Sequence, residues 1–227
     1  MYSPDARYPA GMSESANIVI STALFILIIV DITGNSVVCW IIRRNRDMRN
    51  IVNHLLVNLA IADILFAMFI APSVLLRLTS FHPKGMIATG LCKFVTGGNV
   101  AWIGAISSIF SLVAIAVERY YAVMYPFSNR GNLTKRKLKV IVLVSWIFPV
   151  AFNIPMFLIA TFDNKKQFCI WNWPQEWMPK AYSMAWLFVV VVPLIFMVEL
   201  YFNVVRTLWF KRHSIHLSHE QRVRVKK

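Results

Sequence analysis

Five long apolar segments constrain what this chain of 227 residues can fold into. Each segment holds around 20 or more largely apolar residues, over about 17–42, 51–79, 91–124, 138–161 and 181–210. A helix needs about 20 apolar residues to cross the bilayer core, and it satisfies its own backbone groups there. The hydrophobic content of 58% also exceeds the value of about 45–50% that is typical of soluble domains. The sequence therefore predicts an all-α bundle of five transmembrane helices.

The net charge of +14 is distributed unevenly between the two sides of this predicted bundle. In a soluble protein such a charge suggests nucleic acid, but here the basic residues fall between the apolar segments. One side carries 17 Lys and Arg residues and the other carries 7. The richer side is expected to be cytoplasmic. We expect an extracellular N-terminus (1–16), a transmembrane domain (17–210) and a cytoplasmic basic segment (211–227). The protein is expected to be a multi-pass protein of the plasma membrane. Membrane lipids are expected partners, and nucleic acid is not.

Two of the three cysteines lie on the predicted outer side of the membrane. Cys92 precedes the third segment and Cys169 lies between the fourth and fifth. A disulfide between them persists in an oxidising compartment, and the alternative is two unpaired thiols. Cys39 lies inside the first segment and is expected to be a small, buried apolar residue.

Ionisable residues inside the apolar segments are candidates for function, because burying them in a membrane is costly. Glu118-Arg119-Tyr120 stands at the cytoplasmic end of the third segment, and Asp63 stands within the second. Asn35 and Ser108 are candidate hydrogen-bond partners of Asp63. A polar patch that only fixes helix packing is the alternative, but a carboxylate favours an ion or proton role.

Taken in order along the helices, these residues resemble those of rhodopsin-like (class A) G-protein-coupled receptors over helices one to five. The residues that carry the resemblance are Gly34-Asn35, Leu59-Ala60-x-x-Asp63, Cys92, Glu118-Arg119-Tyr120, Trp146, Cys169, Pro193 and Tyr201. The resemblance implies a receptor that transmits an extracellular signal to a heterotrimeric G protein.

The resemblance also implies roles for individual residues. Arg119 engages the G protein, Glu118 holds Arg119 in the inactive state, and Tyr201 turns inward to support it. Asp63 belongs to an allosteric sodium site with Ser108 as a second ligand and Asn35 nearby. No cofactor is implied beyond that sodium ion.

Two departures from the family pattern stand out. Cys92 lies 27 residues before Arg119, two more than is usual in this family, and Thr96-Gly97-Gly98-Asn99 is the expected place of the extra residues. The chain also stops at Lys227, before the family's sixth and seventh helices, so we expect little or no signalling from it alone. A gene-model artefact and a truncated isoform remain alternative explanations.

The residues near the outer side favour a peptide ligand. Amine receptors carry an acidic residue where this chain has Ala101, or Asn99 in the shifted register, which argues against an amine. Residues 162–171 read as a hairpin with a polar turn, and tryptophans follow it. These tryptophans anchor a peptide or form an interfacial belt, and we favour the peptide. The ligand-binding candidates are Asn99, Trp102, Trp171 and Trp173.

Other function classes fit the sequence less well. A small ion-coupled transporter or channel is the alternative, with Asp31, Asp63 and Glu199 lining an ion path. No inverted symmetry between halves supports it, and five helices divide poorly into two halves. An enzyme is not expected, since the sequence contains no HExxH, GxSxG or glycine-rich phosphate loop.

Overall fold

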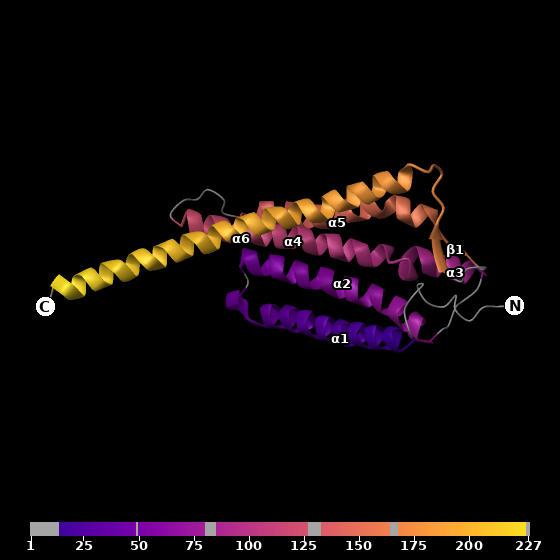
Figure 1. Ribbon diagram of the computed structural model, residues 1–227, viewed down its shortest axis with the longest axis horizontal. Coiled ribbons are helices and arrows are strands. Elements are labelled where there is room, and N and C mark those ends of the chain that lie inside the picture. The colour runs from indigo at the N-terminus through magenta and orange to yellow at the C-terminus, as the bar shows by residue number, and fades with distance from the viewer. Residues whose placement is uncertain (1–13, 49, 80–84, 127–132, 164–167, 226–227) are drawn as a thin grey trace.

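The structure is a computed structural model that describes residues 14–48, 50–79, 85–126, 133–163 and 168–225. Its long helices run side by side in an elongated bundle (Figure 1). The elements are α1 (Glu14–Arg44), the 3-10 helix η2 (Arg46–Met48), α2 (Ile51–Thr79), α3 (Gly85–Leu91), the π-helix η3 (Cys92–Thr96), α4 (Asn99–Met124), α5 (Lys135–Ile159), β1 (Ala160–Asp163), β2 (Phe168–Trp171) and α6 (Met178–Val225).

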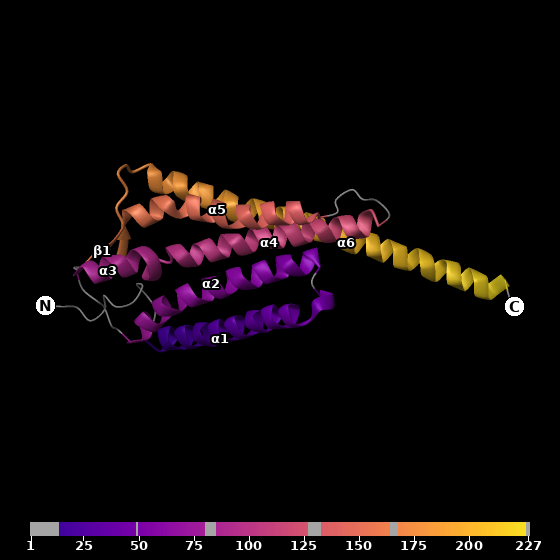
Figure 2. The same ribbon diagram turned by 180° about the vertical axis from the view of Figure 1, so that it is seen from behind.

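The described residues contain five helical stretches long and apolar enough to cross a membrane. These are Ile18–Arg44, Ile51–Leu75, Gly85–Met124, Lys135–Ile159 and Met178–Trp209. They confirm the predicted all-α bundle of five spans. The helices differ from the predicted segments mainly at their ends: α1 begins at Glu14, and α6 continues to Val225 and projects beyond the bundle (Figure 2).

Helix α4 holds the bundle together, since it packs against α2, α5 and α6, while α1 packs on α2. Helices α2 and α4 approach each other closely at Gly104. A Cβ at Gly104 would lie 2.7 Å from the carbonyl oxygen of Ala62 and 2.8 Å from the backbone nitrogen of Phe66. Only a residue without a side chain fits there.

Large apolar side chains cover the outside of the bundle rather than its interior. Among them, Val30 of α1 is 62% exposed, Leu158 of α5 is 70% exposed and Phe188 of α6 is 66% exposed. Soluble monomers rarely expose such continuous apolar surface. The pattern suits a surface that faces lipid.

The third span is interrupted near its start. Residue Gly98 has φ of 77°, a left-handed conformation that glycine adopts without strain. The backbone N–H of Gly97 donates to the Cys92 oxygen at 3.1 Å, and that of Gly98 donates to the Val95 oxygen at 3.0 Å. The interruption between η3 and α4 therefore falls within the four residues where the sequence places the extra residues.

Candidate functional site

A disulfide between Cys92 and Cys169 ties the hairpin to the start of the third span, with the two Cα atoms 5.7 Å apart. The strands β1 and β2 are antiparallel, with Phe162 opposite Cys169. This confirms the predicted disulfide and hairpin, and the alternative of two unpaired thiols is wrong. The predicted turn, residues 164–167, lies outside the described residues. We call this end of the bundle the disulfide end.

The third cysteine differs from expectation. Cys39 is free, as predicted, but its side chain is only partly buried. It lies on α1, a helix that packs mainly on α2, and part of its side chain faces outward. The expectation of a buried residue is thus met only in part, because α1 lies at the edge of the bundle.

An aromatic cluster lies between the helices near the disulfide end. The ring of Trp102 on α4 meets that of Trp186 on α6 edge-on, with centroids 4.8 Å apart, and lies 6.4 Å from that of Phe66 on α2. Phe152 of α5 lies 6.1 Å from Trp186. Four spans thus meet through aromatic rings. The sequence analysis identified Trp102 but not the three other rings. The only sequence signal for those rings was that each lies in the outer part of its span.

The other ligand-binding candidates lie in different surroundings. Trp173 packs against Tyr182 with ring centroids 5.5 Å apart, whereas Trp171 on β2 is 38% exposed. Asn99 is 1% exposed, and its Nδ2 donates to the Lys93 carbonyl at 2.8 Å. Its Oδ1 is buried without a hydrogen-bond partner in the described part of the chain. Trp171 and Trp102 are thus partly exposed, whereas Asn99 lies inside the interruption of the third span.

Asp63 is linked to α4 rather than to α1. The hydroxyl of Ser108 donates a hydrogen bond to Oδ1 of Asp63, as the sequence suggested. Asn35 instead donates to Oδ1 of Asp31 at 2.7 Å and to the Asp31 carbonyl at 3.0 Å. The expectation that Asn35 pairs with Asp63 is wrong within the described residues, because Asp31 lies one helical turn away on the same face of α1.

The Asp63 and Ser108 pair fits part of a cation site. A carboxylate and a hydroxyl supply two oxygen ligands from two different helices, and oxygen ligands suit hard cations. In this structure the Ser108 hydroxyl donates directly to Asp63, so a cation would replace that hydrogen bond.

A second polar link joins three helices at Asn58. Its Nδ2 donates to Ser111 at 2.8 Å and to Ser145 at 3.3 Å, while Trp146 Nε1 donates to its Oδ1 at 2.9 Å. These bonds connect α2, α4 and α5 inside the bundle, where they add to helix packing. Sequence reasoning noted Trp146 but did not predict this link, although a polar residue in the second span was a signal for it.

Glu118, Arg119 and Tyr120 lie near the end of α4 that is opposite the disulfide end. The Arg119 side chain is exposed. Oε2 of Glu118 is buried and has no hydrogen-bond partner among the described residues. No ion pair joins Glu118 to Arg119 in this arrangement. Tyr120 packs instead against the buried Met197 and Leu200 of α6.

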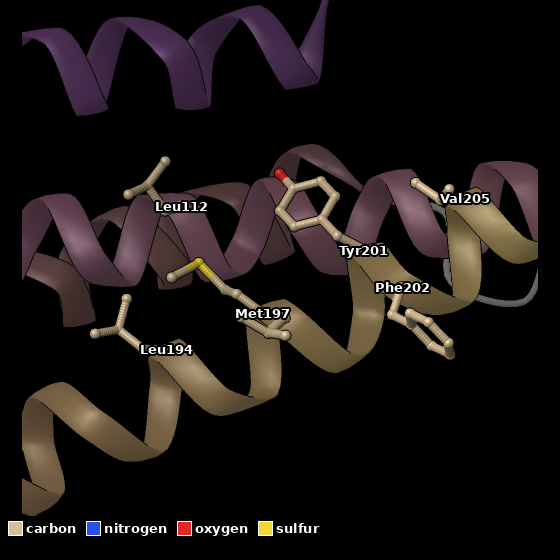
Figure 3. A pocket seen from close by; sticks show the side chains of 7 residues that line it. Leu112, Leu194, Met197, Tyr201, Phe202 and Val205 are labelled. Carbon is tan, nitrogen blue, oxygen red and sulfur yellow. The ribbon is translucent and has the colours of Figure 1, made fainter.

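Tyr201 lines an apolar groove between α4 and α6. Figure 3 shows its ring projecting from α6 toward α4. The groove has a volume of about 570 Å³, and Tyr201 is 42% exposed in it. The lining residues are Leu112, Leu194, Met197, Val198, Tyr201, Phe202 and Val205. Tyr201 is thus on the face of α6 that turns toward α4, the helix that carries Arg119.

Residues 34–227 match the family model described as "7 transmembrane receptor (rhodopsin family)". The chain belongs to this family. It is a multi-pass membrane protein of a receptor family rather than an enzyme, and the transporter or channel alternative is set aside.

Relatives of this receptor chain include the Substance-K receptor of Canis lupus familiaris, 31% identical over 91% of this chain and 55% of the relative. Neuropeptide FF receptor 2 of Mus musculus is 30% identical over 95% of this chain and 54% of the relative. Tachykinin-like peptides receptor 86C of Drosophila melanogaster is 29% identical over 82% of this chain and 38% of the relative. The receptor chain spans about half the length of the curated relatives it matches.

Proposed function

We propose that this receptor chain belongs to a receptor that takes an extracellular peptide at the disulfide end and acts on a heterotrimeric G protein at the opposite end. One observation carries the proposal. The third span connects the disulfide-tethered hairpin, at Cys92, with Glu118-Arg119-Tyr120 near the end of α4. A shift of this one helix can therefore act at both ends.

The distribution of positive charge supports the orientation. By sequence, 17 Lys and Arg residues fall in the segments on the Arg119 side of the spans and 7 in those on the other side, and basic loops stay in the cytoplasm. Residues 1–16 then lie outside, 17–210 form the transmembrane domain, and 211–227 form a basic cytoplasmic segment. An oxidising exterior is also where the Cys92–Cys169 disulfide persists.

Two features support a peptide as the ligand. The relatives carry the names of receptors for substance K, neuropeptide FF and tachykinin-like peptides. The disulfide end presents aromatic side chains, Trp102 and Trp171, that remain 42% and 38% exposed. Exposed tryptophans are frequent anchors of bound peptides. The absence of an acidic residue at Ala101 and at Asn99 argues against a cationic amine.

The surroundings of the Glu118-Arg119-Tyr120 motif support coupling at the opposite end. Arg119 is exposed and thus accessible to a partner protein, and Tyr120 fixes the end of α4 against α6. By the family resemblance, the cavity for the G protein includes the sixth helix. We therefore expect the five-span chain alone to activate a G protein weakly or not at all.

The test uses a seven-helix receptor that contains this chain, expressed in cells with a reporter of G-protein nucleotide exchange. Substance K and neuropeptide FF serve as probes beside a small amine and a lipid mediator. We expect saturable activation by at least one peptide. Trp171→Ala should raise its half-maximal concentration about tenfold or more, as the loss of a central anchor does.

The control variant is Trp40→Ala, which removes a tryptophan that is 58% exposed in the last turns of α1, at the end of the bundle opposite the disulfide. It should leave the half-maximal concentration unchanged. Activation by the amine and by neither peptide contradicts the peptide assignment. Equal effects of the two tryptophan variants contradict the role of Trp171.

A further inference from the structure

Four basic side chains stand together at the start of α5. Lys135, Arg136, Lys137 and Lys139 are all exposed. Thr134 caps the helix by accepting a hydrogen bond from the Lys137 backbone N–H, and the first turn contains no acidic residue. The sequence has no Asp or Glu between Glu118 and Asp163. This cluster, the α5 basic cluster, is therefore not neutralised by acidic neighbours in its own segment.

The cluster continues the outward face of α5. Residues three, four and seven positions apart share one helical face, so Arg136 lies in line with Val140, Leu143 and Ile147. Those three apolar side chains are 54%, 58% and 57% exposed. Lys139 lies one turn before Leu143 on the same stripe. The opposite face of α5, with Ser145, Pro149 and Asn153, is the buried one.

An interfacial pair on α1 indicates the level of the membrane surface at this end. The guanidinium of Arg44 lies 5.2 Å from the ring centroid of Trp40, which is 58% exposed. Tryptophan and arginine gather at the boundary between hydrocarbon and headgroups. The end of α1 and the start of α5 lie at the same end of the bundle (Figure 1). We therefore place the α5 basic cluster near the headgroups at this end, beside a stripe that faces the acyl chains.

We propose that the α5 basic cluster binds the headgroup of an anionic phospholipid, with Arg136 and Lys139 as its principal contacts. A phosphate group meets positive charge from these side chains and from the amino-terminal end of the helix. The acyl chains then lie along Val140, Leu143 and Ile147. The proposal rests on the cytoplasmic placement of this end in the proposed function, because the cytoplasmic leaflet is the one rich in anionic lipid.

The test measures binding of a fluorescent short-chain phosphatidylserine to the purified 227-residue chain in detergent. Short-chain phosphatidylcholine serves as the neutral probe. We expect phosphatidylserine to bind more tightly and to weaken as salt rises. In Arg136→Gln/Lys139→Gln its dissociation constant should rise roughly 30-fold, the equivalent of about 1 kcal/mol for each lost charge. Arg136→Lys/Lys139→Arg keeps both charges and should retain binding.

The matched control is Lys93→Gln/Lys180→Gln, which removes two charges at the disulfide end and should leave binding unchanged. Equal weakening in both double variants means general charge attraction and overturns the site. Unchanged binding in Arg136→Gln/Lys139→Gln also overturns it. If Arg136→Gln/Lys139→Gln in the seven-helix receptor abolishes G-protein activation but leaves lipid binding unchanged, the cluster contacts the G protein instead of lipid. Detergent solution exposes both ends of the bundle to the lipid probe. A negative binding result therefore bears on the lipid site and not on the proposed orientation in the membrane.

Discussion

Glu118 is the residue whose surroundings bear most directly on signalling. Its buried Oε2 has no hydrogen-bond partner in the described structure, while Arg119 beside it is exposed. A carboxylate in that position can attract Arg119 when the side chains rearrange. We interpret Glu118 as the group that restrains Arg119 before activation, a role that the family resemblance implies.

Replacing this carboxylate tests the interpretation. In the seven-helix receptor, Glu118→Gln keeps the shape of the side chain and removes its charge. Basal nucleotide exchange should rise about two- to fivefold, because ion pairs near a surface contribute roughly 0.5–1 kcal/mol. Glu199→Gln, an exposed glutamate on α6, is the control and should leave basal exchange unchanged. A basal rate that is the same in both variants and the parent removes Glu118 from the switch.

Asp63 yields a prediction about sodium. We propose that Asp63 and Ser108 hold a sodium ion that favours the inactive state. Agonist affinity should then fall as sodium replaces potassium at constant ionic strength, by roughly fivefold or more if the coupling is typical. Asp63→Asn should remove this dependence, and Asp31→Asn should retain it because Asp31 pairs with Asn35 within α1. Equal agonist affinity in both salts for the parent receptor leaves Asp63 as a packing residue.

Individual residues show which contacts could be predicted from the sequence alone. The contact of Ser108 with Asp63 involves one of the two partners that the sequence offered for that carboxylate. The pairing of Asn35 with Asp31 depends on the side-chain conformations within one helix turn. The link from Asn58 to Ser111, Ser145 and Trp146 depends on how three helices are rotated about their axes, and hydropathy does not encode that rotation.

Among the elements, the contact between α2 and α4 depends on Gly104. Any side chain there meets backbone atoms of Ala62 and Phe66 at less than 3 Å. Gly104→Ala should therefore destabilise the bundle by about 1–3 kcal/mol, the usual cost of overpacking. Thermal unfolding of the purified chain in detergent measures the change. Gly34→Ala on α1, where nothing lies within 4 Å, should be neutral or slightly stabilising. Equal melting temperatures for both variants contradict the close approach.

The elements show why some boundaries were predictable. The second span matches its predicted range because a largely apolar run extends from Ile51 to Thr79. The start of α5 lies at Lys135 rather than Leu138, because Thr134 caps a first turn of basic residues that a hydropathy criterion leaves out. Helix α6 passes its apolar part at Trp209 and continues through polar residues to Val225, which no apolar pattern predicts. The Gly97-Gly98 pair did signal the interruption of the third span.

For the molecule as a whole, orientation is the property that decides which partners each end can meet. The only Asn-x-Ser/Thr sequence is Asn132-Leu133-Thr134, between the third and fourth spans, and Asn132 itself lies outside the described residues. We predict that it is not glycosylated, because the proposed orientation places this loop in the cytoplasm. Glycosidase treatment of protein from mammalian cells should leave its mobility unchanged.

An introduced site provides the control for that prediction. Asp5→Asn/Arg7→Thr creates an acceptor sequence near the N-terminus, which the proposed orientation places outside. This variant should show a glycosidase-sensitive shift. A shift in the parent chain that disappears in Asn132→Gln reverses the orientation and, with it, the assignment of the two ends.

Transmission between the two ends of α4 is tested most directly by peptide affinity measured with and without nucleotide-free G protein. Coupling between sites is reciprocal, so a G protein that binds at Arg119 must raise peptide affinity at the disulfide end. In the seven-helix receptor we predict a rise of roughly 5- to 150-fold for the parent. In Arg119→Ala the rise should vanish while the affinity without G protein stays the same. An equal rise in both receptors contradicts the assignment of Arg119 as the residue that engages the G protein.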